Sequence, residues 1–103
     1  MAYFVYILKC INGSFYTGYT NDLAKRYKEH LLGNGAKYMR SFKPVEILQS
    51  WCTGDNKSVA IQIEAYIKKM NRVQKIKLLQ QPSELGDLFE LKEGASNLDS
   101  TKF

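Results

Sequence analysis

Three polar side chains occupy helical positions where the pattern of the chain would place core or core-edge residues. Arg26 and His30 lie one helical turn apart, beside an apolar stripe. Glu64 stands in a second helical segment, next to residues that would face inward. Guanidinium, imidazole and carboxylate groups carry much of the anion-binding and acid–base chemistry of proteins. The three residues are therefore candidates for a functional site.

Each of the three also has a simple structural explanation. Glu64 can pair with Lys68 at i, i+4, which is worth only about 0.2–0.5 kcal/mol and is common on helices. His30 can be a core-edge histidine with one hydrogen bond. Arg26 can lay its aliphatic stem over apolar surface and keep its charge in water. Taken singly, none of the three demands a function.

Two tyrosines and a glycine in the first two strand segments add a question of register. A two-residue loop at Asn12-Gly13 would pair Tyr6 with Tyr19 and leave Tyr16 on the other side of the sheet. A three-residue loop with Gly13 in a left-handed bulge would instead pair Tyr6 with Gly18 and place both phenols on one surface. In that register Gly18 leaves a notch opposite the Tyr6 ring.

The helices and strands that position these residues are predicted from the spacing of apolar residues and from residues that begin or end helices. A helix begins after Asn21-Asp22 and ends at Gly33, and Pro82 ends the regular part of the chain. The expected strands are 3–10, 15–20 and 45–52, and the expected helices are about 23–32, 58–70 and 73–80, with a loop or short helical turn over 33–44. The inner stripes are Leu23, Tyr27 and Leu31 in the first helix, and Ala60, Ile63, Ile67 and Met70 in the second.

The order β-β-α-β-α-α predicts an α+β fold, a small three-stranded antiparallel sheet covered by helices. The first strand is apolar on both alternating sets, so we expect it to be central. We expect one folded domain over 1–82 and an acidic, flexible tail over 83–103. At 103 residues the chain can bury one modest core.

Composition favours a polyanionic partner. The net charge is +5, and residues 1–82 hold 13 basic and 5 acidic side chains, so the predicted domain is more basic than the average. A basic face fits nucleic acid, although lysines that only keep the protein in solution explain the charge equally well.

No long apolar run or signal-peptide pattern is present, so we expect a cytoplasmic protein. Cys10 and Cys52 are expected to be free thiols.

Taken in order along the chain, these residues resemble the GIY-YIG nuclease domain. The resemblance is carried by "VYI" at 5–7, "YTG" at 16–18, the Arg26–His30 pair and Glu64, and it covers roughly residues 3–80. It is closest to the small, stand-alone bacterial branch, with "GAKY" at 35–38, Pro44-Val45 and the Glu64–Lys68 spacing. Val5 and Thr17 replace the first glycine and the second isoleucine of the family name, and Met39 stands where a small hydroxyl residue is common.

The resemblance implies metal-dependent hydrolysis of a phosphodiester, leaving 5′-phosphate and 3′-hydroxyl ends. Glu64 would hold one Mg²⁺ or Mn²⁺, and Arg26 would stabilise charge on the phosphate oxygens. Tyr6 would take the proton from the attacking water, provided that nearby positive charge lowers its pKa. His30 would supply that charge or accept the proton onward, and Tyr16 would orient phosphate or water, with the notch at Gly18 letting the backbone approach it.

The expected substrate is DNA, without exclusion of RNA, cleaved with little sequence specificity and in the service of DNA repair or recombination. We expect no domain that reads base sequence and strongly salt-dependent binding. The alternative is a nucleic-acid-binding module of the same fold with little or no cleavage. Residues expected to contact nucleic acid, or alternatively to lie in a solvated loop or on a helix surface, are Gly18, Lys37, Tyr38, Arg40, Lys43 and Lys68.

Overall fold

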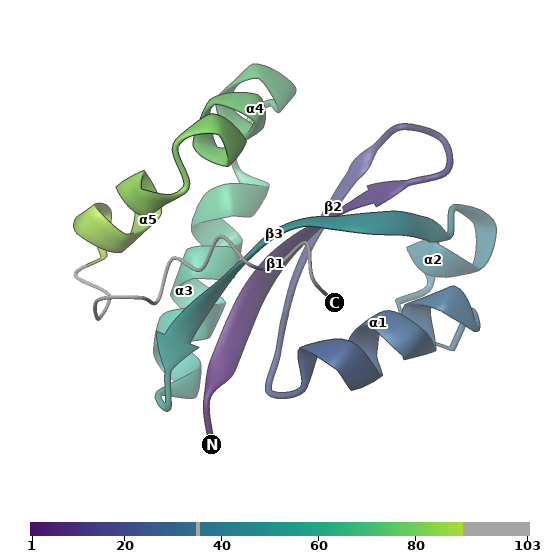
Figure 1. Cartoon of the computed structure of the whole chain (residues 1–103), viewed down its shortest axis with the longest axis horizontal. Helices are drawn as coiled ribbons and strands as arrows, with labels where there is room; N and C mark the ends of the chain where they lie inside the picture. Colours follow the sequence, from purple (N-terminus) through teal and green to yellow (C-terminus); the bar gives the residue numbers. More distant parts are fainter. Residues whose placement is uncertain (35, 90–103) are drawn as a thin grey trace.

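A central antiparallel strand organises the protein. The structure, a computed structural model, describes residues 1–34 and 36–89. Its sheet has the order β2-β1-β3, with β1 at Tyr3–Cys10, β2 at Phe15–Thr20 and β3 at Pro44–Gly54 (Figure 1). Helices cover both faces of the sheet, as expected for a strand β1 whose two alternating sets of residues are both apolar. The predicted α+β fold is confirmed.

The turn between β1 and β2 decides which side chains share a face. Gly13 has φ +82°, a left-handed conformation that glycine adopts at no steric cost, and its amide donates to the Cys10 carbonyl over 2.8 Å. The resulting register pairs Tyr6 with Gly18, and Tyr16 with Leu8. This is the three-residue loop, and both phenols lie on one surface.

Helices α1 (Leu23–Leu31) and α2 (Tyr38–Ser41) cover the face that carries the tyrosines. The Asp22 side chain accepts the Lys25 amide over 3.1 Å and so caps α1. The predicted inner stripe of α1 is wrong at its end: Leu31 is 41% exposed, whereas His30 is fully buried. The reason is that His30 finds a hydrogen-bond partner on β1, which a histidine needs when buried.

Helices α3 (Lys57–Lys68), α4 (Arg72–Gln80) and α5 (Ser83–Leu88) lie on the other face (Figure 1). The predicted stripe of α3 is confirmed for Ala60, Ile63 and Ile67, which are wholly buried, while Met70 lies beyond the helix and packs at the margin of this core. Since α1 and α3 lie on opposite faces, they can meet only at an edge of the sheet.

Regular structure continues past Pro82, where the sequence predicted that it would end. Pro82 is the N-cap of α5, and its carbonyl accepts the Trp51 indole Nε1–H over 2.8 Å. Leu85 is 1% exposed in the core beneath β3 and α3. A short polar helix with one anchoring leucine carries too weak a periodicity to be read from sequence. The rest of the predicted tail, 90–103, lies outside the described residues.

Two smaller expectations can be compared with the structure. Cys10 is buried and Cys52 is half-buried, and both are free thiols. In the described part of the chain, no helix is both long and apolar enough to cross a membrane.

Candidate active site

An open cavity of about 430 Å³ lies at the outer edge of β2, between α1 and α3. β2 is the edge strand, so side chains of α1 on one face and of α3 on the other reach around it. The cavity is lined by Tyr6, Tyr16, Gly18, Arg26 and Glu64, among others. Four of the five predicted catalytic residues thus share one cavity, and the fifth, His30, lies directly behind Tyr6.

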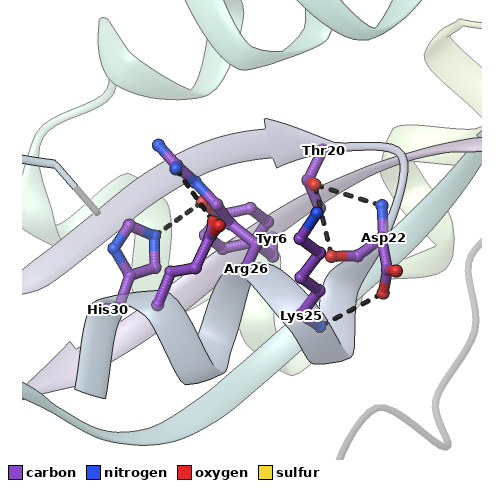
Figure 2. A network of polar contacts seen from close by, with 7 residues as sticks. Tyr6, Thr20, Asp22, Lys25, Arg26 and His30 are labelled. Carbon is purple, nitrogen blue, oxygen red and sulfur yellow. Dashed lines mark hydrogen bonds and ion pairs between the residues drawn. The ribbon is translucent and has the colours of Figure 1, made fainter. Parts of the chain in front are cut away.

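A hydrogen bond joins Tyr6 to His30 in the interior. The Tyr6 hydroxyl lies 3.0 Å from His30 Nε2, and the two residues are 1% and 0% exposed (Figure 2). Figure 2 also shows the Arg26 side chain beside the same hydroxyl. A guanidinium can only donate hydrogen bonds, so the phenol oxygen is best placed to face Arg26 as an acceptor. The phenol proton then points to Nε2, and neutral His30 carries its own proton on Nδ1.

The charge states differ from the sequence expectation for Tyr6. Burial, and then the nearby Tyr16, raise the pKa of Tyr6 to about 12, although Arg26 acts in the opposite direction. Burial, and then the positive charge of Arg26, lower the pKa of His30 to about 4. His30 is therefore neutral at pH 7 and cannot supply the positive charge that would make Tyr6 a phenolate. Its remaining expected role is to accept a proton.

His30 lacks the support that stabilises a protonated histidine in many sites. Among the described residues, Nδ1 is buried and has no hydrogen-bond partner. A buried donor without a partner costs about 1–3 kcal/mol. The Glu29 carboxylate favours the imidazolium, but burial and Arg26 outweigh it. Further negative charge near the ring would therefore favour protonated His30.

Gly18 is required by the Tyr6 side chain itself. A Cβ at Gly18 would lie 2.5 Å from the Tyr6 hydroxyl oxygen and 2.7 Å from Cζ, closer than real Cβ contacts come. The notch predicted from sequence exists, but the phenol fills it. Gly18 therefore allows Tyr6 to lie flat against β2, with its oxygen at the cavity wall.

A row of aromatic rings leads away from the cavity. Tyr16 lies edge-on to His30 with ring centroids 5.4 Å apart, and stacks on Tyr38 at 6.3 Å. Phe42 continues the row 5.0 Å from Tyr38. The Tyr38 hydroxyl is held by Ser14 Oγ at 2.7 Å, so α2 is fastened to the β1–β2 turn. Burial raises the pKa of Tyr16, which keeps it a neutral phenol.

Arg26 has a carboxylate partner that sequence reasoning missed. Its Nη1 lies 3.3 Å from Glu29 Oε1, and Glu29 also lines the cavity. The i, i+3 spacing on one helix was the available signal. Hydrogen bonds to Tyr6 and Glu29 outweigh the opposing effect of burial and raise the pKa of Arg26. The guanidinium is therefore a fixed cation whose direction is set by Glu29.

Glu64 is the carboxylate that α3 contributes to the cavity. Its Oε2 lies 3.6 Å from Lys68 Nζ, so the simple i, i+4 pair anticipated from sequence is present. In the residues described, no group of three or more histidine, cysteine or acidic side chains could hold a metal ion. A single carboxylate in an open, hydrated cavity suits a cation such as Mg²⁺, which keeps several waters and takes further oxygen ligands from phosphate. The residues present thus fit a hydrated divalent ion at Glu64.

The residues predicted to contact nucleic acid divide into two groups. Gly18 lines the cavity, and Lys68 adjoins it through Glu64. The others lie in or beside α2: Lys37, Tyr38, Arg40 and Lys43 are exposed and do not line the cavity. The predicted set lacks two lysines that line the cavity, Lys25 and Lys57.

Comparison with known families agrees with this geometry. The family described as the GIY-YIG catalytic domain matches residues 2–77. The chain belongs to the GIY-YIG family. The match covers the sheet, α1, α2, α3 and most of α4, and it ends before α5.

The chain is also similar to small bacterial proteins over most of their length. UPF0213 protein FN1575 of Fusobacterium nucleatum is 43% identical over 82 residues, which cover 80% of this chain and 81% of that protein. UPF0213 protein YazA of Bacillus subtilis is 47% identical over 75 residues, covering 71% and 73%. The solution NMR structure of UPF0213 protein BH0048 from Bacillus halodurans is 35% identical, with a TM-score of 0.50, and covers 89% of this chain and all of that one.

Proposed function

We propose that the protein is a divalent-metal-dependent endonuclease that hydrolyses phosphodiester bonds in DNA. The observation that carries the proposal is the Tyr6 hydroxyl, which bonds to His30 Nε2 at 3.0 Å on the wall of a cavity shared with Arg26 and Glu64. Membership of the GIY-YIG family supports the nuclease class.

The Tyr6–His30 pair would activate the attacking water. With a pKa of about 12, Tyr6 is a neutral phenol, so it can take a proton from water only by passing its own proton to His30 Nε2. The negative phosphate of a bound substrate favours protonated His30, because an opposite charge stabilises the imidazolium. Substrate binding would therefore add to the effect of Glu29 and oppose the effects of burial and Arg26 on the pKa of His30.

Arg26 and Tyr16 would hold the phosphate for in-line attack. The Arg26 fork, oriented by Glu29, can donate to the non-bridging oxygens, where charge develops in the transition state. Tyr16, also on the cavity wall, can donate its phenol proton to a phosphate oxygen or to the water. The water oxygen joins phosphorus, the bond to the 3′ oxygen breaks, and that oxygen takes a proton from solvent.

Glu64 would hold the divalent cation, Mg²⁺ or Mn²⁺, through one carboxylate oxygen. The ion supplies Lewis-acid stabilisation of the phosphate and of the leaving oxygen when it is bound. The cation would compete with the Lys68 ammonium for the Glu64 carboxylate, and a released Lys68 ammonium would be available to a phosphate of the nucleic acid.

The cavity lining favours recognition of the sugar–phosphate backbone over base edges. Most of its functional groups are phenols, cations and carboxylates on an open strand edge, which suit phosphate contacts that carry no sequence information. We therefore propose little sequence specificity, selection of substrate by shape, and a role in DNA repair or recombination. The exposed basic residues around α2 would add backbone contacts.

The test is cleavage of branched, flapped, duplex and single-stranded DNA with Mg²⁺ or Mn²⁺. Wild type should cleave at least one substrate, and Glu64→Gln should lose cleavage while retaining the fold. Glu46→Gln is the matched control, because Glu46 is exposed on β3 and does not line the cavity. Equal activity in wild type and Glu64→Gln would exclude the proposed metal site. Binding without cleavage of any substrate would instead establish a binding module.

A further inference from the structure

The cavity extends well beyond the proposed catalytic residues. Besides these residues, its lining includes Tyr19, Thr20 and Asn21, at the end of β2 and just before α1. At about 430 Å³ the cavity falls within the size range of pockets that bury a whole small ligand. It is thus larger than one phosphodiester group needs.

Two lysines stand on opposite walls of this extension. Lys25 belongs to the first turn of α1, and Lys57 is the first residue of α3. Both helices begin at the same end of the molecule (Figure 1), and Figure 2 shows the Lys25 side chain extending towards Thr20 at the end of β2. On α3, Lys57 and Glu64 are seven residues apart, so they share a face and lie about 10 Å apart along the helix axis.

The acidic residues that line the cavity have partners other than the Lys25 and Lys57 ammonium groups. Asp22 caps α1, Glu29 pairs with Arg26, and Glu64 pairs with Lys68. Within residues 1–34 and 36–89, neither Lys25 nor Lys57 makes an ion pair. Two ammonium groups that line one cavity without an ion pair among the described residues favour an anion in that cavity.

We propose that Lys25 and Lys57 form a second phosphate subsite, which binds a backbone phosphate that flanks the scissile one. This inference rests on the proposed nuclease function and adds the path that the bound nucleic-acid strand would take. The bound strand would run along the free edge of β2, from the Tyr6–Arg26–Glu64 centre towards the Lys25–Lys57 end. A substrate with one phosphodiester would fill only the catalytic part, whereas an oligonucleotide would fill both.

Binding can be measured without cleavage. In a Glu64→Gln background, the affinity for a labelled single-stranded oligonucleotide is measured by fluorescence anisotropy over a range of salt concentrations. Lys25→Ala/Lys57→Ala should reduce the slope of log affinity against log salt by about 0.7, the loss of one neutralised phosphate on a single strand. Lys28→Ala/Lys69→Ala is the control, because it removes the same charge from the ends of the same two helices at residues that do not line the cavity.

Cleavage by the protein with an intact Glu64 gives a second readout. Lys25→Ala/Lys57→Ala should lower kcat/KM for an oligonucleotide several-fold and leave kcat/KM for thymidine 5′-(4-nitrophenyl phosphate), which has one phosphodiester, unchanged. Equal slope losses in the paired and control variants, or equal losses of kcat/KM on both substrates, would overturn the subsite and leave the nuclease proposal standing. Failure of the unmutated protein to bind or cleave either substrate would overturn both.

Discussion

At the scale of single residues, the site depends on two residues, Gly18 and His30, that lower the stability of the fold. Gly18 gives up a side chain in a strand so that the Tyr6 phenol can lie against the backbone. His30 is wholly buried with one satisfied nitrogen, and its second nitrogen has no partner among the described residues. Both residues position the same group, the Tyr6 hydroxyl: Gly18 makes room for it and His30 forms a hydrogen bond with it.

Gly18→Ala should displace the Tyr6 ring. The added methyl group would meet the phenol oxygen at 2.5 Å, so we expect a loss of about 1–3 kcal/mol in the free energy of unfolding, measured by urea denaturation, together with loss of cleavage. Tyr6→Phe removes the nearest atom of this contact. The penalty of Gly18→Ala should therefore be smaller in a Tyr6→Phe background, and strict additivity of the two substitutions would argue against the steric explanation.

His30→Gln should flatten the pH dependence of stability. His30 titrates near pH 6.5 in the unfolded chain and near 4 in the fold, so the unfolded state binds more protons between these values. The free energy of unfolding should then fall by on the order of 3 kcal/mol as pH drops from 6.5 to 4. His30 is the chain's single histidine, so the difference between wild-type and variant urea curves isolates this effect. Parallel curves would contradict the buried neutral state.

At the scale of elements, α1 and α3 contribute side chains to one cavity at the edge of β2. Arg26 comes from one face of the sheet and Glu64 from the other, and both line one cavity because β2 is the edge strand. The Glu64–Lys68 pair links metal binding to this arrangement, because the ammonium occupies the carboxylate that the cation would use.

Lys68→Met should tighten the binding of Mn²⁺. The methionine keeps the apolar stem and removes the competing ammonium, whose exposed ion pair with Glu64 is worth about 0.2–1 kcal/mol. We expect up to about a fivefold gain in affinity by titration calorimetry, since 1.4 kcal/mol corresponds to a factor of ten. Lys69→Met removes the same charge at the C-cap of α3 and should leave the affinity unchanged. A weaker affinity in Lys68→Met would show that Lys68 supports the ion.

At the scale of the whole molecule, the fold reaches beyond the family match. Residues 2–77 correspond to the GIY-YIG domain. Helix α5 nevertheless packs into the core on the α3 face of the sheet through Leu85, and the Trp51–Pro82 hydrogen bond holds its start. Trp51 lies on β3, so α5 is fastened to the sheet as well as to neighbouring helices. The acidic segment after Pro82 is therefore in part structural.

Leu85→Ala should destabilise the entire domain. Leu85 is 1% exposed in the core that contains Val5 and Ile63, so removing its side chain should cost about 2–5 kcal/mol in the free energy of unfolding. Leu88→Ala, three residues along the same helix, should cost much less because Leu88 is 57% exposed. Equal and small effects of the two substitutions in urea denaturation would mean that α5 is peripheral to stability.

The sequence by itself determined the elements that depend on local signals. β1 was predicted as central because it is apolar on both alternating sets, and the inner stripe of α3 followed from its helical period. Asp22 and Gly33 correctly marked the limits of α1, since caps act within a few residues. The catalytic candidates were found because polar residues interrupted these local patterns, and their order resembled a family.

Only the tertiary structure decided the quantities that depend on residues far apart in the chain. The register of the hairpin, left open between two loops, was selected by the conformation of Gly13 and brought Tyr6 to Gly18. The protonation states of Tyr6 and His30 were set by burial between β1 and α1, which no local pattern reports. Lys25 and Lys57, 32 residues apart, share a cavity only because α1 and α3 pack on opposite faces of the same edge strand.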